Sequence, residues 1–414
     1  MRVKSYIIMA ITLSLLMNLA ISSATAQMPK VAPKLPEKQR ELPPGTGFIR
    51  PLMDLSHLTG KRLPERFKAL PLPPARWDWR EQGKVTPVRN QGTCSSCYAF
   101  ASVANIESKM LMDDAGIFDF SENNAKECNW YETSCGGGNN YKMASWFSKK
   151  GTVLESRDPY VASDVSCKST CPYIKTLLDW RVISADNIPM TSILQNYIHT
   201  YGPVYTTFYA GDDSDPAWRS EFSNYDGSYT LYYTDSWDVN HAVLIVGWDD
   251  TLSHAGGAGA WIVKNSWGTY WGGPCGYGTE RGYFTIAYGS ANIGMWSSYM
   301  DDWQDYDQNG EIFYYDEGGW SNSWGYGTTT AWGLCKFVLT DTMDLTRVEL
   351  WTTDATTDID VYIYDDFNGS TLSNLLASKL NISYNEAGYH SVTLDSPIEI
   401  VAVDDIYVAV KFTN

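Results

Sequence analysis

Apolar residues at helical spacing mark one stretch in the first third of the chain. Residues 96–112 contain no proline or glycine. Four apolar residues of this stretch recur at intervals of three or four positions, namely Phe100, Val103, Ile106 and Met110. Such intervals place side chains on one face of an α-helix, and either Ser95 or Ser96 is suited to cap its N-terminus. The pattern predicts a helix whose first turn contains Cys97.

Beyond about residue 181 the pattern changes to that of β-strands. Runs rich in β-branched and aromatic residues lie at 202–209, 241–248 and 261–268, and such runs are typical of buried strands. After residue 300, apolar and polar residues alternate with a period of two. The clearest of these alternating stretches are 348–352, 359–363 and 406–412. Half-buried strands of this kind predict an all-β C-terminal domain, which we expect to be a β-sandwich.

The first 26 residues have the pattern of a secretory signal peptide. Arg2 and Lys4 give a positive start, a mostly apolar run covers residues 6–21, and Ala24-Thr25-Ala26 resembles a signal-peptidase cleavage site. An uncleaved anchor helix is the alternative. The short apolar run and its Ala-x-Ala end favour cleavage, so we expect residues 1–26 to be removed on export.

Charge and proline content change sharply after this segment. Residues 27–72 carry repeated prolines and many lysines and arginines, which predicts an extended pro-segment or linker. The whole chain has 414 residues, a formal net charge of −17 and a pI of about 4.7. This length indicates two or three domains, and the negative charge argues against nucleic acid or an anionic membrane as a partner.

Cys97 is a candidate nucleophile because of its place in the predicted helix. The N–H groups of the first turn and the helix dipole favour an anion, so we expect a lowered pKa and a populated thiolate. The alternative is a buried or disulfide-bonded cysteine, which is common in exported proteins. A zinc site is disfavoured, because Cys94 and Cys97 are followed by no second pair at zinc-ribbon spacing.

A nucleophilic thiol needs a base, and His241 is the strongest candidate. Of the five histidines, it alone starts a run that reads as a buried strand, although a single histidine is often structural. Asn265 follows 24 residues later. Its side-chain amide could accept a hydrogen bond from the imidazole and fix the tautomer.

The sequence around these residues resembles the papain-like cysteine proteases. Cys94-Ser95-Ser96-Cys97-Tyr98 is similar to the family's Cys-Gly-(Ser/Ala)-Cys-(Trp/Tyr) signature. His241 follows Cys97 by 144 residues, within the roughly 130–150 residues typical of the family. The resemblance starts at Trp77 and its neighbours and covers residues 73–299. It departs from the usual family sequence at Ser95, at Tyr98 and in a polar stretch, 211–238. We expect this stretch to alter the shape of the cleft.

The resemblance implies a two-lobed α+β fold, with a helical lobe and a β-barrel-like lobe, and a site that needs no cofactor or metal. It implies that Gln91 stabilises the oxyanion, that Asn265 orients His241, and that Trp267 shields that hydrogen bond from water. Two glycines, Gly137 and Gly138, would pair with the main chain of a protein or peptide substrate in antiparallel fashion. The disulfides that it implies are Cys94–Cys135 and Cys128–Cys167. A pro-segment of this family usually occupies the cleft.

Residues 300–414 resemble the lectin-like domains that follow some exported papain-like proteases, and the domain at this end could be incomplete. A carbohydrate or another cell-surface ligand is therefore a candidate partner. The aromatic pair Tyr314 and Tyr315, with Trp320, could form a sugar-stacking surface or part of a core. Residues 305–310 resemble the first half of a calcium loop with Asp316 at its end, and a solvated acidic linker is the alternative.

We expect a secreted or cell-surface cysteine endopeptidase that works through an acyl-enzyme. The alternative function is a binding or adhesion protein with a vestigial peptidase domain. Since all candidate site residues lie between Gln91 and Trp267, we expect the peptidase domain and the C-terminal domain to have separate cores.

Overall fold

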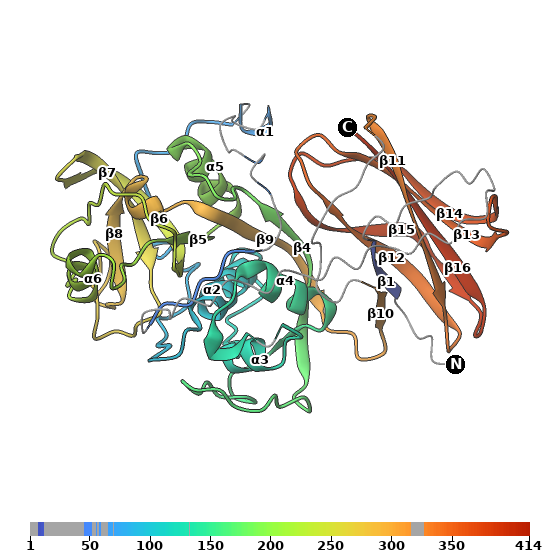
Figure 1. Ribbon diagram of the computed structural model, residues 1–414, viewed down its shortest axis with the longest axis horizontal. Helices are drawn as coiled ribbons and strands as arrows, with labels where there is room; N and C mark the ends of the chain where they lie inside the picture. Colours follow the sequence, from blue (N-terminus) through green and yellow to red (C-terminus); the bar gives the residue numbers. More distant parts are fainter. Residues whose placement is uncertain are drawn as a thin grey trace.

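The computed structural model describes residues 7–11, 45–51, 55, 58, 65–68, 70–131, 133–315 and 327–414. A region of mixed helices and strands lies beside a region of strands only (Figure 1). The α-helices are α1 (Glu65–Lys68), α2 (Cys97–Met112), α3 (Glu122–Glu127), α4 (Asn140–Lys149), α5 (Thr191–Tyr201) and α6 (Pro216–Ser223). The predicted α+β class with an all-β C-terminal domain is confirmed.

The helix predicted at residues 96–112 is α2, and it passes through the centre of the mixed region. Ser96 occupies the N-cap position but makes no side-chain capping bond. Its hydroxyl instead lies 2.7 Å from the hydroxyl of Tyr160. Nearly every residue from Cys97 to Met110 is buried, because α2 packs against β6 on one side and α4 on another. The helix is therefore buried around most of its circumference, although some of its buried residues are polar, among them Asn105 and Glu107.

The mixed region contributes eight of the described strands. They are β2 (Arg76–Asp78), β3 (Thr152–Val153), β4 (Tyr173–Val182), β5 (Val204–Phe208), β6 (His241–His254), β7 (Gly257–Lys264), β8 (Tyr283–Ala287) and β9 (Met295–Asp305). The three runs predicted in this region correspond to β5, β6 and β7. The β5–β6 register places Phe208 opposite His241, so the first residue of β6 lies at the end of a buried antiparallel pair.

The C-terminal domain is a sandwich of two layers. Its strands are β10 (Glu311–Tyr314), β11 (Thr330–Val338), β12 (Met343–Thr352), β13 (Asp358–Phe367), β14 (Leu372–Ser383), β15 (Gly388–Ile400) and β16 (Asp405–Thr413). One layer has the order β11-β16-β13-β14, and β12 and β15 belong to the other. Apolar residues of both layers, among them Leu350 and Val408, form a core of this domain. The alternation with a period of two therefore marked the inward positions correctly.

One sheet continues from the mixed region into the C-terminal domain. Strand β15 pairs with β4, with Gly388 opposite Arg181 and Tyr389 opposite Trp180. The path of this sheet is β10-β1-β12-β15-β4-β9-β5-β6-β7-β8. Strand β1 (Ile7–Ile11), within the predicted signal peptide, pairs in parallel with β10 and β12. No helix of the described residues has both the length and the apolarity to cross a membrane.

The two regions also share a hydrophobic core. A single cluster of buried residues contains Cys97 and Tyr98 of α2 together with Trp351 and Tyr389 of the C-terminal domain. The expectation of wholly separate cores is therefore wrong, because β15 extends the sheet of the mixed region and brings its own aromatic residues to the junction. The boundary expected between residues 299 and 300 lies inside β9.

Candidate active site

Cys97 is the first residue of α2 and is fully buried. The backbone N–H of Ala242 donates a hydrogen bond to its sulfur at 3.3 Å. Ala242 directly follows His241 at the start of β6. The helix N-terminus and the first residues of the strand thus place the candidate nucleophile beside the residue that follows the candidate base.

His241 and Asn265 form a buried hydrogen-bonded pair. Nε2 of His241 lies 2.8 Å from Oδ1 of Asn265, and Asn265 directly follows β7, the neighbour of β6. Because an amide oxygen can only accept, this contact assigns the proton to Nε2 and leaves Nδ1 with a lone pair. Nδ1 is buried and has no hydrogen-bond partner among the described residues. The ring of Trp267 lies 5.4 Å from the imidazole and covers the pair.

Burial keeps both candidate groups neutral. Loss of hydration raises the pKa of Cys97 to about 12, although backbone hydrogen bonds from Ala242 and Tyr98 oppose the shift. The same loss lowers the pKa of His241 to about 4, although the bond to Asn265 opposes it. The lowered pKa that the sequence suggested for Cys97 is therefore not the state seen here. The first turn of α2 favours a thiolate at Cys97, but the loss of hydration of that thiolate outweighs the effect.

Gln91 lies beside the start of α2. Its Nε2 donates to the carbonyl of Cys94 at 2.8 Å and approaches the carbonyl of Thr46 at 3.4 Å. Its Oε1 accepts a hydrogen bond from the hydroxyl of Ser266 at 2.6 Å. The amide is fully buried, so its donor side is fixed toward two backbone carbonyls.

Residues 45–51 cover these side chains. They belong to the expected pro-segment or linker, residues 27–72, which we call the leader. Trp267 donates from Nε1 to the carbonyl of Gly45 at 2.6 Å. The carbonyl of Asn240 accepts from the N–H groups of Gly47 and Phe48 at 3.1 and 3.0 Å. These bonds hold the segment directly over the start of β6, which explains why neither Cys97 nor His241 is exposed.

The other side of the same segment is held by Gly138. Its N–H donates to the carbonyl of Gly47 at 2.9 Å, and its carbonyl accepts from Ile49 at 2.8 Å. The pairing of Phe48 with Gly138 is parallel. At Gly137, whose φ is +94°, a β-carbon would lie 2.8 Å from the carbonyl of Gly47. The glycines therefore permit a close approach of main chains, as the sequence suggested.

We call the apolar surroundings of the Phe48 side chain the Phe48 pocket. This side chain is only 3% exposed and belongs to the hydrophobic cluster that contains Cys97. Its ring lies 6.4 Å from that of Trp296 at the start of β9. Phe48 is two residues from Thr46, whose carbonyl lies 3.4 Å from Nε2 of Gln91, so this pocket is close to Gln91.

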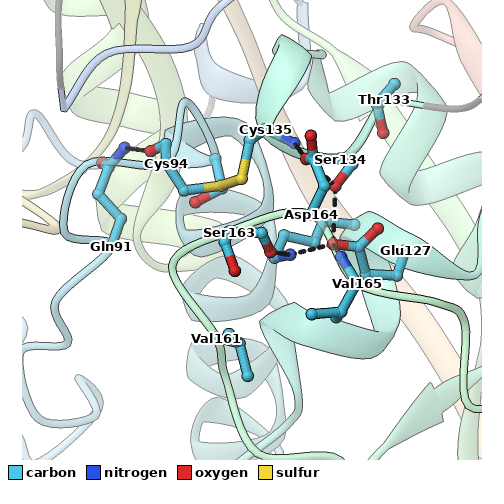
Figure 2. Close-up of a disulfide and its surroundings, with 12 residues drawn as sticks. Gln91, Cys94, Glu127, Thr133, Ser134, Cys135, Val161, Ser163, Asp164 and Val165 are labelled. Carbon is cyan, nitrogen blue, oxygen red and sulfur yellow. Dashed lines mark hydrogen bonds and ion pairs between the residues drawn. A yellow bond between two sulfur atoms is a disulfide. The ribbon is translucent and has the colours of Figure 1, made fainter.

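Two disulfides fix the loops around the site, Cys94–Cys135 and Cys128–Cys167. They are the two pairs that the family resemblance implies. Figure 2 shows the first bridge, with Gln91 beside Cys94 and Asp164 beside Cys135. Asp164 accepts hydrogen bonds from the hydroxyl of Ser134 at 2.6 Å and from the N–H of Cys135 at 2.9 Å. The loop before α2 is thereby tied to the glycine-rich segment that binds the leader.

Sequence reasoning did not single out Asn240 or Ser266. Asn240 contributes its backbone carbonyl, a role that leaves no signature in residue type. Ser266 holds Gln91 and stands between Asn265 and Trp267, so its position in that motif was an available signal.

The aromatic residues proposed as a sugar surface do not lie together in the described part. Tyr314 is half-buried and packs on Trp130 and Lys149 of the mixed region, whereas the ring of Tyr315 lies on Phe337. In the acidic 305–310 stretch, the carboxylate of Asp305 pairs with Lys175. Trp320 and Asp316 lie outside the described residues.

Comparison with known proteins gives two matched families. Residues 73–300 match the family described as papain family cysteine protease, and residues 312–414 match the lectin like domain. A cathepsin L-like proteinase of Fasciola hepatica is 32% identical over 225 residues, which are 53% of this chain and 62% of that protein. Cathepsin J of Rattus norvegicus is 34% identical over 200 residues, which are 47% and 57%. The chain thus spans less than two thirds of either relative.

Solved structures show a likeness of fold. The clostridial cysteine protease Cwp84 after propeptide cleavage is similar with a TM-score of 0.64 at 20% identity, covering 82% of this chain and 84% of that one. The cysteine protease and lectin-like domains of Cwp84, described as a surface layer associated protein of Clostridium difficile, give 0.62 at 19% identity, over 82% and 75%.

Proposed function

Because this chain belongs to the papain family of cysteine proteases, we propose that it is an exported endopeptidase that cleaves peptide bonds through Cys97, His241 and Asn265. The observation that carries the proposal is the convergence at α2 and β6. The amide of Asn265 lies 2.8 Å from His241, and the residue after His241 bonds to the sulfur of Cys97 at 3.3 Å. The free Nδ1 of the imidazole is the atom that can accept the thiol proton.

In the proposed reaction, Cys97 transfers its proton to Nδ1 of His241, and the thiolate attacks the substrate carbonyl carbon. The backbone N–H of Cys97 and the Gln91 amide stabilise the oxyanion. The C–N bond then breaks, and His241 returns the proton to the leaving amine. Water attacks the resulting thioester with His241 as base, which releases the acid and restores the thiol. Asn265 keeps the imidazole in the required tautomer.

We also propose that residues 45–51 are an inhibitory part of a pro-segment, within the expected 27–72 leader. They pair in parallel with Gly138, whereas the family resemblance implies antiparallel pairing for a substrate. The segment therefore crosses the site in the direction opposite to a substrate. It also removes water from Cys97 and His241, and so favours their unreactive neutral forms.

Covalent labelling tests both proposals. A biotinylated peptide epoxide is added to the full chain, before and after limited proteolysis of the leader, and hydrolysis of a fluorogenic peptide is measured in parallel. We expect labelling and hydrolysis only after the leader is cut. Both should be absent in Cys97→Ser and retained in Cys171→Ser, the matched change at another buried cysteine outside the disulfides.

Three outcomes separate the possibilities. Labelling that persists in a folded Cys97→Ser protein would show that another residue is the nucleophile. Equal labelling of the intact and the cut chain would refute inhibition by the leader. A cut chain that is folded but neither labelled nor active would favour the alternative, an adhesion protein with a vestigial peptidase domain.

We propose that the C-terminal domain binds a carbohydrate, either at the cell surface or after secretion. The match to a lectin like domain supports this. Trp332 is 39% exposed, and its ring lies 5.6 Å from that of Tyr362, two strands away in the same layer. Exposed flat rings suit sugar stacking. Quenching of tryptophan fluorescence by a cell-wall polysaccharide, lost in Trp332→Ala, is the expected result.

A further inference from the structure

A continuous series of aromatic rings links the C-terminal domain to the pocket in the cleft. Trp351 of β12 stacks on Tyr141 of α4, with centroids 6.2 Å apart and planes 4° from parallel. Tyr141 meets Trp296 of β9 edge to face at 6.3 Å. Trp296 in turn lies 6.4 Å from Phe48. Trp296, which borders the Phe48 pocket, therefore packs through Tyr141 against Trp351 of the C-terminal domain.

The middle of this series is tightly packed. Trp180 of β4 lies 4.9 Å from Tyr141 and 4.8 Å from Trp351, nearly perpendicular to both. All three rings are buried, with exposed fractions of 1% for Trp180, 4% for Tyr141 and 8% for Trp351. Interiors packed at this density transmit a change of volume to their neighbours. A smaller side chain in place of Trp351 would leave Tyr141 without its stacking partner.

Ring packing positions Tyr141 and Trp296, because their polar atoms are not engaged. The hydroxyl of Tyr141 and the Nε1 of Trp296 are buried and have no hydrogen-bond partner within the described residues. Their positions therefore depend on the neighbouring rings and, for Trp296, on the guanidinium of Arg50, which lies 5.7 Å from its ring. Removal of one ring takes away part of this restraint and leaves space into which Tyr141 and Trp296 can rotate.

The backbone at Trp296 makes this dependence stronger. Trp296 has a φ of +52°, which is unfavourable for a bulky residue and persists only where the surroundings enforce it. Its N–H bonds to the carbonyl of Ala185 at 2.6 Å. Loss of the packing behind Trp296 would allow the first residues of β9 to relax and the Phe48 pocket to widen.

We propose that Trp351 of the C-terminal domain is a positioning residue of the peptidase cleft, which fixes the Phe48 pocket through Tyr141 and Trp296. This rests on the proposed peptidase function. The C-terminal domain then has two roles, since one of its residues shapes the cleft in addition to any ligand that the domain binds. The pocket should discriminate between large and small substrate side chains only while this support is intact.

The test uses the full chain with its leader cut. Two fluorogenic peptides differ only in the second residue before the cleaved bond, phenylalanine in one and alanine in the other. We expect the wild type to prefer phenylalanine. In Trp351→Leu, this preference in kcat/KM should fall about fivefold or more, the scale of a lost fit in an apolar pocket. The fall should come from KM for the phenylalanine peptide, whereas kcat for the alanine peptide stays within twofold.

Conservative and matched variants separate positioning from general damage. Trp351→Phe keeps a ring against Tyr141 and should retain most of the preference. Leu375→Ala changes an exposed apolar residue of β14, in the other layer of the same domain, and should leave the preference unchanged. Should Trp351→Leu fail to fold by circular dichroism, Tyr141→Leu interrupts the same series within the peptidase domain, and the same loss of preference is expected.

The results have distinct meanings. An unchanged preference in folded Trp351→Leu, or in Tyr141→Leu if that variant is needed, would overturn the inference while leaving the peptidase proposal intact. A wild type that does not prefer phenylalanine over alanine would show that the Phe48 pocket does not bind this substrate residue. This result would also overturn the inference. A wild type that cleaves neither peptide would instead contradict the peptidase proposal itself.

Discussion

Gly47 crosses the backbone of Ser95 so closely that a β-carbon on Gly47 would lie 2.1 Å from the Ser95 carbonyl oxygen. Real β-carbons do not approach other atoms to this distance. The loop that carries Ser95 cannot easily withdraw, because the adjacent Cys94 is bonded to Cys135. Glycine is therefore required at this point if the leader is to remain docked.

The first prediction concerns Gly47→Ala. Because the methyl group would collide with the backbone, the segment should leave the cleft more often, and the intact chain should react with a peptide epoxide about tenfold faster or more, which corresponds to about 1.4 kcal/mol or more of lost docking. Mass spectrometry must show that the leader is uncut. Gly136→Ala is the control, since no atom lies within 4 Å of its added β-carbon. An unchanged rate in Gly47→Ala would mean that another contact dominates docking.

The second prediction is that acid releases the leader. The pKa of His241 is lowered to about 4 when the segment covers it, and the exposed ring should return toward about 6.5. Between these values the open state binds a proton that the covered state does not. The fraction of molecules in which the leader has left the site should therefore rise by up to about tenfold per pH unit as the pH falls from 6.5 to 4.

Hydrogen exchange at Gly47, Phe48 and Ile49, corrected for intrinsic rates, measures this opening. We expect the pH dependence to disappear in His241→Gln and to persist in His254→Gln, a change at a histidine outside the site. If His241→Gln shows the same acid response as the wild type, the proton is taken up elsewhere.

The third prediction concerns the oxyanion donor. Gln91→Ala should lower kcat of the cut enzyme by about 10²–10³, the usual effect of one lost donor. Ser266→Ala should cause a smaller loss, because it removes only the hydrogen bond that orients the Gln91 amide. Gln195→Ala, at a surface amide that bonds to Asp250, serves as the control. A change of less than threefold in kcat/KM for Gln91→Ala would remove this residue from the proposed site.

The sequence singled out Cys97 and His241, and the structure places them at the starts of α2 and β6, which meet through the bond from Ala242 to the Cys97 sulfur. Cys97 was recognisable because its place before an apolar helix and its spacing to His241 are both properties of the chain itself. The position of the leader was not recognisable in the same way. Gly47 and Phe48 are held through backbone groups of Asn240 and Gly138, and such contacts carry no residue signature.

The pKa of Cys97 and the domain junction could not be predicted for a related reason. Local sequence reports the helix N-terminus, which favours a thiolate, but not the segment that excludes water from it. Similarly, the alternation in β12, β13 and β16 marks their inward positions, but the pairing of Tyr389 with Trp180 joins residues that are 209 positions apart. Long-range packing decided both outcomes.

At this junction, Arg181 is the cation among several carboxylates. It pairs with Asp179 and lies 3.7 Å from Asp301 and 4.0 Å from Glu386 of the C-terminal domain. It also donates to the carbonyl of Tyr389 at 3.2 Å. Desolvation raises the pKa of Asp179 well above its usual range even with Arg181 present, and Nδ1 of His390 lies 3.8 Å from the same carboxylate.

The fourth prediction is that Arg181→Met destabilises the full chain by about 3–5 kcal/mol at pH 7, the cost of leaving buried charges without their partner. The loss should shrink as the pH falls through the raised pKa of Asp179, because a protonated carboxyl needs no counter-ion. Urea unfolding at a series of pH values from 7 downward measures the loss and its pH dependence. Arg219→Met is the matched control, because Arg219 pairs with Asp213 at the surface and should contribute less than about 1 kcal/mol. Equal destabilisation by the two variants, or a loss in Arg181→Met that does not depend on pH, would show that Arg181 contributes packing at the junction and not neutralisation of its carboxylates.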